Sequence, residues 1–181
     1  MGLFKKHQVS ESEAIDIITD NLIKRTICCA NLADDIRKSD ISGLTSESKT
    51  TLTCEFHLLR FHLVDRLAFT QGLNENMRLK VSNGILTRLR AKGLLLATIE
   101  ELNERDIYYS PCIDLFPKSP SEPGSLIGKL MLKVEQQGGT LNSIDEMLLS
   151  KGLADLVINK AFTDAEIQAC IALKAGQLPN K

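Results

Sequence analysis

The chain has 181 residues, of which 43% are hydrophobic and 25% charged, and its formal net charge is −1. This length and composition are those of a globular protein with its own core, and they exclude a disordered or fibrous chain. The net charge is close to zero, so it does not indicate the kind of partner. Five cysteines without zinc-ligand spacing or a disulfide framework favour a reducing, cytoplasmic setting, and no cofactor is needed for stability.

The sequence gives no sign of a membrane segment. The opening residues MGLFKKHQ are followed at once by polar residues, so they lack the apolar stretch of a secretory signal. The apolar run from Leu94 to Ala97 is far too short to span a bilayer. We therefore expect no membrane association.

A first helix is predicted from the capping box formed by Ser10 and Glu13. Residues at alternating steps of three and four then form one buried seam: Ile15, Ile18, Leu22, Arg25, Cys29, Leu32 and Ile36. Arg25 interrupts this apolar seam. We expect its stem to pack on apolar surface with the charge at the edge; the alternative is a buried partner.

Helix ends are predicted where a Gly-Leu pair recurs. Glycine adopts the left-handed conformation just past a helix, and the apolar residue that follows packs back on the last turn. The pair occurs four times, at Gly43, Gly72, Gly93 and Gly152. Four such stops imply at least five helices.

A central helix is predicted at about 47–71. Its main apolar stripe has the helical period: Leu52, Phe56, Leu59, Leu63 and Leu67. A second apolar strip lies on another side: Cys54, Phe61, Val64 and Ala68. A helix that is apolar on two sides is either enclosed by other helices or offers one side to a partner subunit.

A third helix is predicted from Asn74 to about Lys92, with five basic residues and one acid. We expect this basic face to be solvated and balanced by the acidic stretch that follows, residues 98–124. Its charges spread around the cylinder and no aromatic residue accompanies them, so nucleic acid is not an expected partner. A predicted recognition helix at 164–175 would present acids to the phosphates, which argues against DNA binding as well.

A short helix is predicted from Leu94 to Arg105, capped by Thr98 with Glu101. The segment 106–124 shows no helical period and holds four of the five prolines, so we interpret it as a long loop ending in a linker at 118–124.

Helical patterning resumes at Ser125, with a hinge at Gly138-Gly139. Two further capping boxes, Ser143 with Glu146 and Thr163 with Glu166, predict short helices at about 143–150, 154–160 and 164–175. No segment has the alternation of a strand pair. We therefore predict an all-α helical bundle of about five to eight helices. Its segments are an N-terminal bundle at 1–117, the linker at 118–124 and short C-terminal helices at 125–181, packed as one domain.

One polar line on the central helix is a candidate site. Glu55, His62 and Arg66 fall close to one line of the helix, with Asp65 nearby, and carboxylates beside a histidine are what a metal site in a bundle uses. The Glu-x-x-His step of di-iron bundles is absent, so we favour a flank of salt bridges and hydrogen bonds over a polar patch that binds a partner or a metal or catalytic site. A metal ion or small apolar ligand near His62 and Asp65 is the alternative. His57 points to another side and needs no function.

The functional prediction is recognition of another protein. The sequence has no nucleophile elbow and no phosphate-cradling loop, so it does not favour an enzyme. Amphipathic helices with spare apolar area fit a protein that docks another chain or itself, and a homodimer is our leading hypothesis. The predicted interaction residues are Phe61, Val64, Ala68, Tyr108 and Tyr109.

Overall fold

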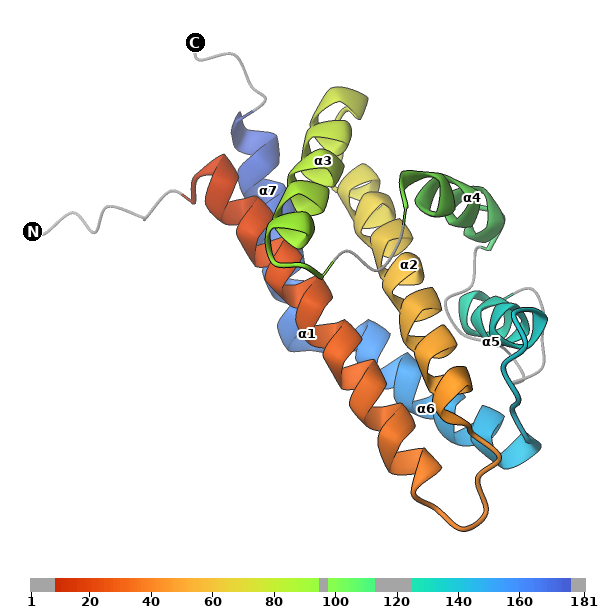
Figure 1. The fold of residues 1–181 in the computed structure, drawn as a ribbon. Coiled ribbons are helices and arrows are strands. Elements are labelled where there is room, and N and C mark those ends of the chain that lie inside the picture. The colour runs from red at the N-terminus through yellow and green to blue at the C-terminus, as the bar shows by residue number, and fades with distance from the viewer. Residues whose placement is uncertain (1–8, 95–97, 113–124, 177–181) are drawn as a thin grey trace, which may run out of the picture. The chain divides into compact units, whose positions relative to one another are not determined.

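The computed structural model describes residues 9–94, 98–112 and 125–176, and over these residues it is all-α, as predicted. The described residues form seven helices and no strand (Figure 1). Their bounds are α1 (Glu11–Arg37), α2 (Ser46–Thr70), α3 (Glu75–Ala91), α4 (Ile99–Tyr109), α5 (Leu126–Gln136), α6 (Ser143–Ile158) and α7 (Lys160–Gly176).

The chain divides into two compact units. The first unit comprises the described residues of Met1–Asn21, Val64–Leu94 and Lys160–Lys181, and the second those of Leu22–Leu63 and Leu95–Asn159. Two helices, α1 and α2, therefore contribute one part to each unit. The linker predicted at 118–124 lies outside the described residues, and the division into segments 1–117 and 125–181 stays a prediction.

The prediction of a central helix is confirmed by α2. Every residue from Glu55 to His62 is buried, which requires neighbours on all sides of the helix. The core of the second unit gathers apolar side chains from α1, α2, α5 and α6, among them Cys29, Ala33, Leu52, Phe56, Leu59, Ile127, Leu130, Leu149 and Leu153. The buried apolar residues of the first unit include Ile15, Ile18, Val64, Val81, Ile85, Leu89 and Leu173.

The seam of α1 is confirmed, but the expectation for Arg25 is wrong. Its side chain is fully buried, and its Nη1 donates to the carbonyl oxygens of Leu156 and Val157, each at 2.6 Å. Because α6 ends at Ile158, these carbonyls belong to its last turn and have no partner within the helix. Arg25 therefore caps the C-terminus of α6, which favours positive charge.

Three glycines end helices in the left-handed conformation. Gly72 (φ 80°) and Gly93 (φ 65°) lie where a stop was predicted, and Leu73 and Leu94 donate back to the carbonyls of Ala68 and Leu89. The predicted hinge at Gly138 is also a stop: Gly138 has φ 86°, and Gly139 N donates to Val134 O at 2.9 Å. The stops at Gly72 and Gly93 are confirmed.

The stop predicted at Gly152 is wrong, because α6 runs through it from Ser143 to Ile158. A Cβ atom on Gly152 would lie 2.5 Å from Leu32 Cδ2 and 2.8 Å from Cδ1. This glycine is required by packing: it lets α6 approach the Leu32 side chain of α1. The helices predicted at 143–150 and 154–160 are therefore one continuous helix as far as Ile158.

Replacing Gly152 with alanine is expected to destabilise the protein. Alanine favours helix by about 1 kcal/mol over glycine, but the added methyl would clash with Leu32, and overpacking of this kind costs about 1–3 kcal/mol. We expect a net loss in the free energy of unfolding measured with urea. The matched control is Gly176→Ala on α7, where nothing lies within 4 Å of the added Cβ; a gain in stability for Gly152→Ala would contradict the packing role.

The capping predictions are confirmed at three helices. Ser10 with Glu13 and Thr98 with Glu101 form capping boxes, and Asn74 caps α3. The predicted helix at 94–105 begins later and continues through Asp106 to Tyr109, so the loop starts after α4. The remainder of the predicted loop, 113–124, lies outside the described residues.

Two C-terminal capping predictions are wrong. The box that starts α6 is Asn142 with Asp145, one residue before the predicted pair. Asp145 is the acid of this capping box because its fully buried carboxylate is also held by hydrogen bonds from Ser42 Oγ (2.6 Å) and from Gly43 N (2.9 Å). Thr163 and Glu166 lie inside α7, which already begins at Lys160, and Glu166 is buried.

Acidic residues of α1 and α2 form ion pairs with four of the basic residues of α3. The expectation that residues 98–124 neutralise these four cations is therefore wrong. Within the first unit, the ion pairs are Lys80 with Glu11, Arg88 with Asp16, Lys92 with Asp20 and Arg78 with Asp65. Residue numbers rise along both helices in the first three pairs, so α1 and α3 run parallel. The contact is close: a Cβ on Gly84 would lie 3.0 Å from Ile15 Cγ2.

Candidate functional site

Glu55, on the predicted polar line of α2, forms a buried salt bridge. Glu55 accepts from Arg105 of α4 through Nε (2.8 Å) and Nη2 (2.7 Å), and Gln137 Nε2 donates to the same carboxylate at 2.7 Å. Both side chains of the ion pair are buried. The bidentate pair fixes α4 on α2, and the hydrogen bonds that Arg105 donates to Glu55 raise the pKa of Arg105. This geometry is that of a structural flank.

His62 and Tyr109 extend the same buried cluster. His62 Nδ1 lies 2.7 Å from Asp106 Oδ1, and its ring centroid is 6.0 Å from that of Tyr109. The buried His62 Nε2 and Tyr109 hydroxyl have no hydrogen-bond partner among the residues that the structure describes. Burial and the nearby Glu55 carboxylate raise the pKa of Tyr109 well above its ordinary value, so this phenol is a poor nucleophile.

The three candidate metal ligands do not converge. Glu55 is held by Arg105, His62 by Asp106, and Asp65 accepts from Arg78 Nη1 at 3.0 Å. Across residues 9–94, 98–112 and 125–176, no three His, Cys, Asp or Glu side chains gather in a way that could hold a metal ion. Nothing in this geometry favours the metal alternative.

His57 is a buried neutral histidine. Thr26 Oγ1 donates its single proton to Leu22 O at 2.9 Å, so in its 3.3 Å contact with His57 the ring Nδ1–H must be the donor. Nε2 is then the unprotonated nitrogen, and it is buried without a hydrogen-bond partner in the described part of the chain. Burial lowers the pKa of His57 from 6.5 to about 4.

Stability is expected to fall as pH drops from about 6.5 to 4. In this window the unfolded chain protonates His57 and the folded chain does not. The shift of the His57 pKa from 6.5 to about 4 therefore lowers the free energy of unfolding by about 3 kcal/mol as the pH falls through this interval. Urea unfolding at several pH values measures the slope. His57→Asn, which keeps a donor near Thr26, should flatten it; equal slopes in both proteins would contradict this assignment.

Four of the five predicted interaction residues lie inside the protein. Phe61, Val64, Ala68 and Tyr109 are buried. Tyr108 is half-buried and held by α5: its hydroxyl donates to Lys129 O at 3.2 Å, and Lys129 Nζ lies 4.7 Å from the ring centroid. The second apolar strip of α2 thus serves packing, and a surface for a partner is to be sought elsewhere.

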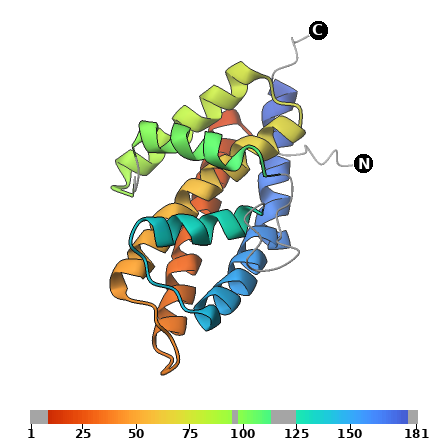
Figure 2. The same cartoon turned by 90° about the vertical axis from the view of Figure 1, so that its right-hand side faces the viewer.

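Such a surface occurs on α6, which follows α5 through a short loop in the second unit (Figure 2). One side of α6 buries Leu149, Leu153 and Val157. The opposite side, which we call the α6 face, is formed by the exposed residues Ile144, Met147, Leu148, Lys151, Asp155 and Ile158. Their spacing keeps all six within about 100° of the helix circumference. The face is therefore one continuous strip.

The α6 face is apolar at both ends. The exposed fractions are 39% for Ile144, 57% for Met147, 37% for Leu148 and 51% for Ile158. Near its N-terminal end lies Ile41, which is 59% exposed and whose carbonyl oxygen accepts from Asn142 Nδ2 at 3.0 Å. The sequence does not reveal this face, because a helix stop at Gly152 would split it between two helices.

Two charged residues lie in the middle of the α6 face. Lys151 and Asp155 are exposed, and neither forms an ion pair or hydrogen bond with another residue that the structure describes. Their charges are therefore available to a partner.

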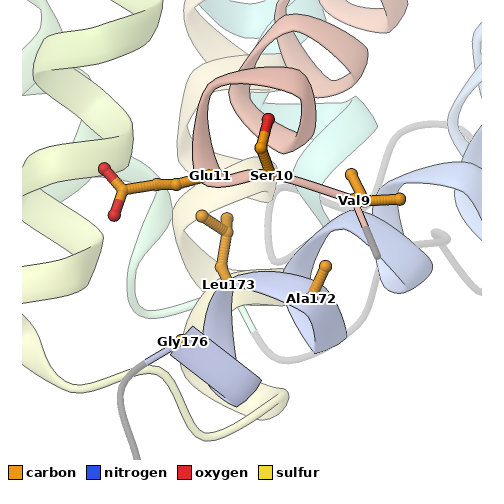
Figure 3. A pocket seen from close by; sticks show the side chains of 6 residues that line it. All are labelled: Val9, Ser10, Glu11, Ala172, Leu173 and Gly176. Atoms are coloured by element: carbon orange, nitrogen blue, oxygen red, sulfur yellow. The ribbon is translucent and has the colours of Figure 1, made fainter. Parts of the chain in front are cut away.

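A pocket of about 260 Å³ lies in the first unit between the N-terminus of α1 and the C-terminal turns of α7 (Figure 3). The described residues that line it include Val9, Ala172 and Leu173, and the one carboxylate among the described lining residues, Glu11, points away from these three. Glu11 is paired with Lys80 at 2.8 Å. The pocket thus lacks the clustered titratable groups of an active site.

Comparison with protein-family models, with curated proteins and with solved structures gave no match to this chain. In the part of the chain that the structure describes, none of the helices combines the length and apolar character needed to cross a membrane.

Proposed function

We propose that this protein acts through contact with another protein chain, not through catalysis, and that the α6 face is the contact surface. The observation that carries the proposal is the exposed apolar strip on a helix whose other side already fills the core of the second unit. When a helix is apolar on two sides and other helices cover only one of these sides, the exposed side is available to a partner.

The side chains of this face give a partner a favourable contact. Ile144, Met147, Leu148 and Ile158 each leave more than a third of their surface in water. Covering such side chains stabilises a complex by roughly 25 cal/mol per Å² of apolar surface. The rigid helix beneath them loses little conformational freedom on binding, because Leu149, Leu153 and Val157 already fix it to the core.

The proposed setting is the cytoplasm. Its support is the state of the cysteines: all five are free thiols, and Cys29, Cys112 and Cys170 are buried. Burial raises the pKa of Cys170 to about 11, so this thiol stays protonated and unreactive.

Photo-crosslinking tests the contact. A photoreactive amino acid at Met147 should give a discrete product in which this chain is joined to another polypeptide, in the cells that make the protein. The same amino acid at Lys24, an exposed position on α1, is the matched control and should give little product. Equal yields from both positions, or products only within one chain, would contradict the proposal.

A further inference from the structure

The order of residues along the α6 face is self-complementary. Leu148 and Ile158 lie five residues before and after Leu153, and Lys151 and Asp155 lie two residues before and after it. An antiparallel copy of the helix, related by a two-fold axis at the height of Leu153, would set each of these four residues against its counterpart. A two-fold interface requires this property, since each surface must fit itself.

We propose that the occupant of the α6 face is a second copy of this chain, with the two α6 helices antiparallel and Lys151 of each copy paired with Asp155 of the other. This inference rests on the proposed function and names its partner. Leu148 of each copy packs against Ile158 of the other at the two ends of the contact. The interface is isologous, so it closes on a dimer.

Electrostatics selects this arrangement over a parallel one. A parallel pair about a two-fold axis places Lys151 beside Lys151 and Asp155 beside Asp155, which is unfavourable for both residues. The antiparallel register gives two opposite-charge contacts instead. Neither residue has a competing partner among the described residues, so both charges are free to pair.

The size of the contact sets its strength. With 16 residues, α6 is roughly 24 Å long. One helix pair of this length covers less than the roughly 800 Å² per partner of a standard interface. We therefore expect a dimer that dissociates in the micromolar range, as weak interfaces do.

Sedimentation equilibrium of charge-reversed variants tests the register. Lys151→Glu and Asp155→Lys, each measured alone, should weaken self-association by about tenfold or more, because both cross-pairs become repulsive. An equimolar mixture of the two variants should associate as the wild type does. In the mixed pair, Glu at 151 of one chain meets Lys at 155 of the other, and the remaining native pair is intact.

The mixture also controls for effects within one helix. Lys151 and Asp155 are one turn apart, so each reversal places like charges side by side on its own helix. Mixing leaves those intrachain contacts unchanged, and recovery of the dimer can come only from contacts between chains. Circular dichroism of each variant checks that the helix content is retained.

The outcomes separate this inference from the proposed function. A wild type that stays monomeric at all concentrations, while position 147 crosslinks a different protein, overturns the second copy as partner and leaves the proposed function standing. A dimer that Met147→Asp dissociates, but whose charge-reversed variants do not recover on mixing, overturns the antiparallel register alone. A dimer unaffected by Met147→Asp overturns the second copy as the occupant of the α6 face, whereas the proposed function is overturned by equal crosslinking yields at positions 147 and 24.

Discussion

Replacing Arg25 with methionine is expected to lower the free energy of unfolding by about 2–5 kcal/mol, because it leaves two carbonyl groups unpaired and each unpaired buried group costs about 1–3 kcal/mol. Methionine keeps most of the stem but removes the donors to Leu156 O and Val157 O. Both carbonyls are in the last turn of α6, and the positive charge that favours this helix end is lost as well. Urea unfolding followed by circular dichroism measures the change.

The neighbouring residue provides the control for Arg25. Lys24 is exposed on the same helix, so Lys24→Met should change stability by less than about 0.5 kcal/mol. Arg25→Lys keeps the charge but replaces the planar fork with a shorter, compact donor, so its loss should fall between the two. Equal, small effects for Arg25→Met and Lys24→Met would show that Arg25 does not cap α6.

Replacing Glu55 with glutamine is expected to destabilise the protein by about 3–5 kcal/mol, because it removes the buried counter-charge of Arg105 and leaves only the exposed Glu104 carboxylate, 3.6 Å from Arg105 Nη1. Glutamine has nearly the same shape, so the effect isolates the charge. The Glu55 carboxylate also accepts from Gln137 Nε2, a contact that one amide oxygen cannot serve together with both Arg105 donors. The loss should appear in urea unfolding at neutral pH.

A double-mutant cycle separates the interaction energy of the Glu55–Arg105 pair from the effect of each single substitution. Arg105→Met alone leaves a buried carboxylate and should cost a similar amount, whereas Glu55→Met with Arg105→Met replaces the pair by apolar side chains. We expect the double variant to be more stable than either single variant, as buried ion pairs exchanged for apolar residues often are. Additive losses would mean that the two residues do not act as a pair.

The sequence predicted the features that depend on local chemistry. The apolar period of α1 and α2 and the caps at Ser10, Asn74 and Thr98 follow from interactions a few residues apart, and the structure contains them. The left-handed stop at Gly72 likewise depends only on the helix that it ends. All-α architecture could therefore be derived from the chain alone.

The features that were missed depend on contacts far apart in the chain. Gly152 has the sequence context of a helix stop, but Leu32 of α1 determines its role. Arg25 was expected at an edge because its partners, 131 and 132 residues away, are backbone carbonyls that carry no sequence signature. Asp145 was passed over as a cap because its bonds to Ser42 and Gly43 cannot be read locally.

The candidate surface shows the same limit. The spacing from Ile144 to Ile158 is visible in the sequence once 143–158 is taken as one helix, yet which side of α6 is buried follows only from the fold. Conversely, Val64 and Ala68 have the pattern of a docking strip and are buried.

Light scattering at micromolar concentration on the wild type and Met147→Asp tests whether two copies of the chain associate through the α6 face. Met147 is 57% exposed, so the substitution should leave the fold intact while placing a charge in the apolar contact. We expect a concentration-dependent dimer for the wild type, a monomer for Met147→Asp, and an unchanged dimer for the control Asn31→Asp at an exposed site on α1. The same mass for all three proteins would contradict association through this face.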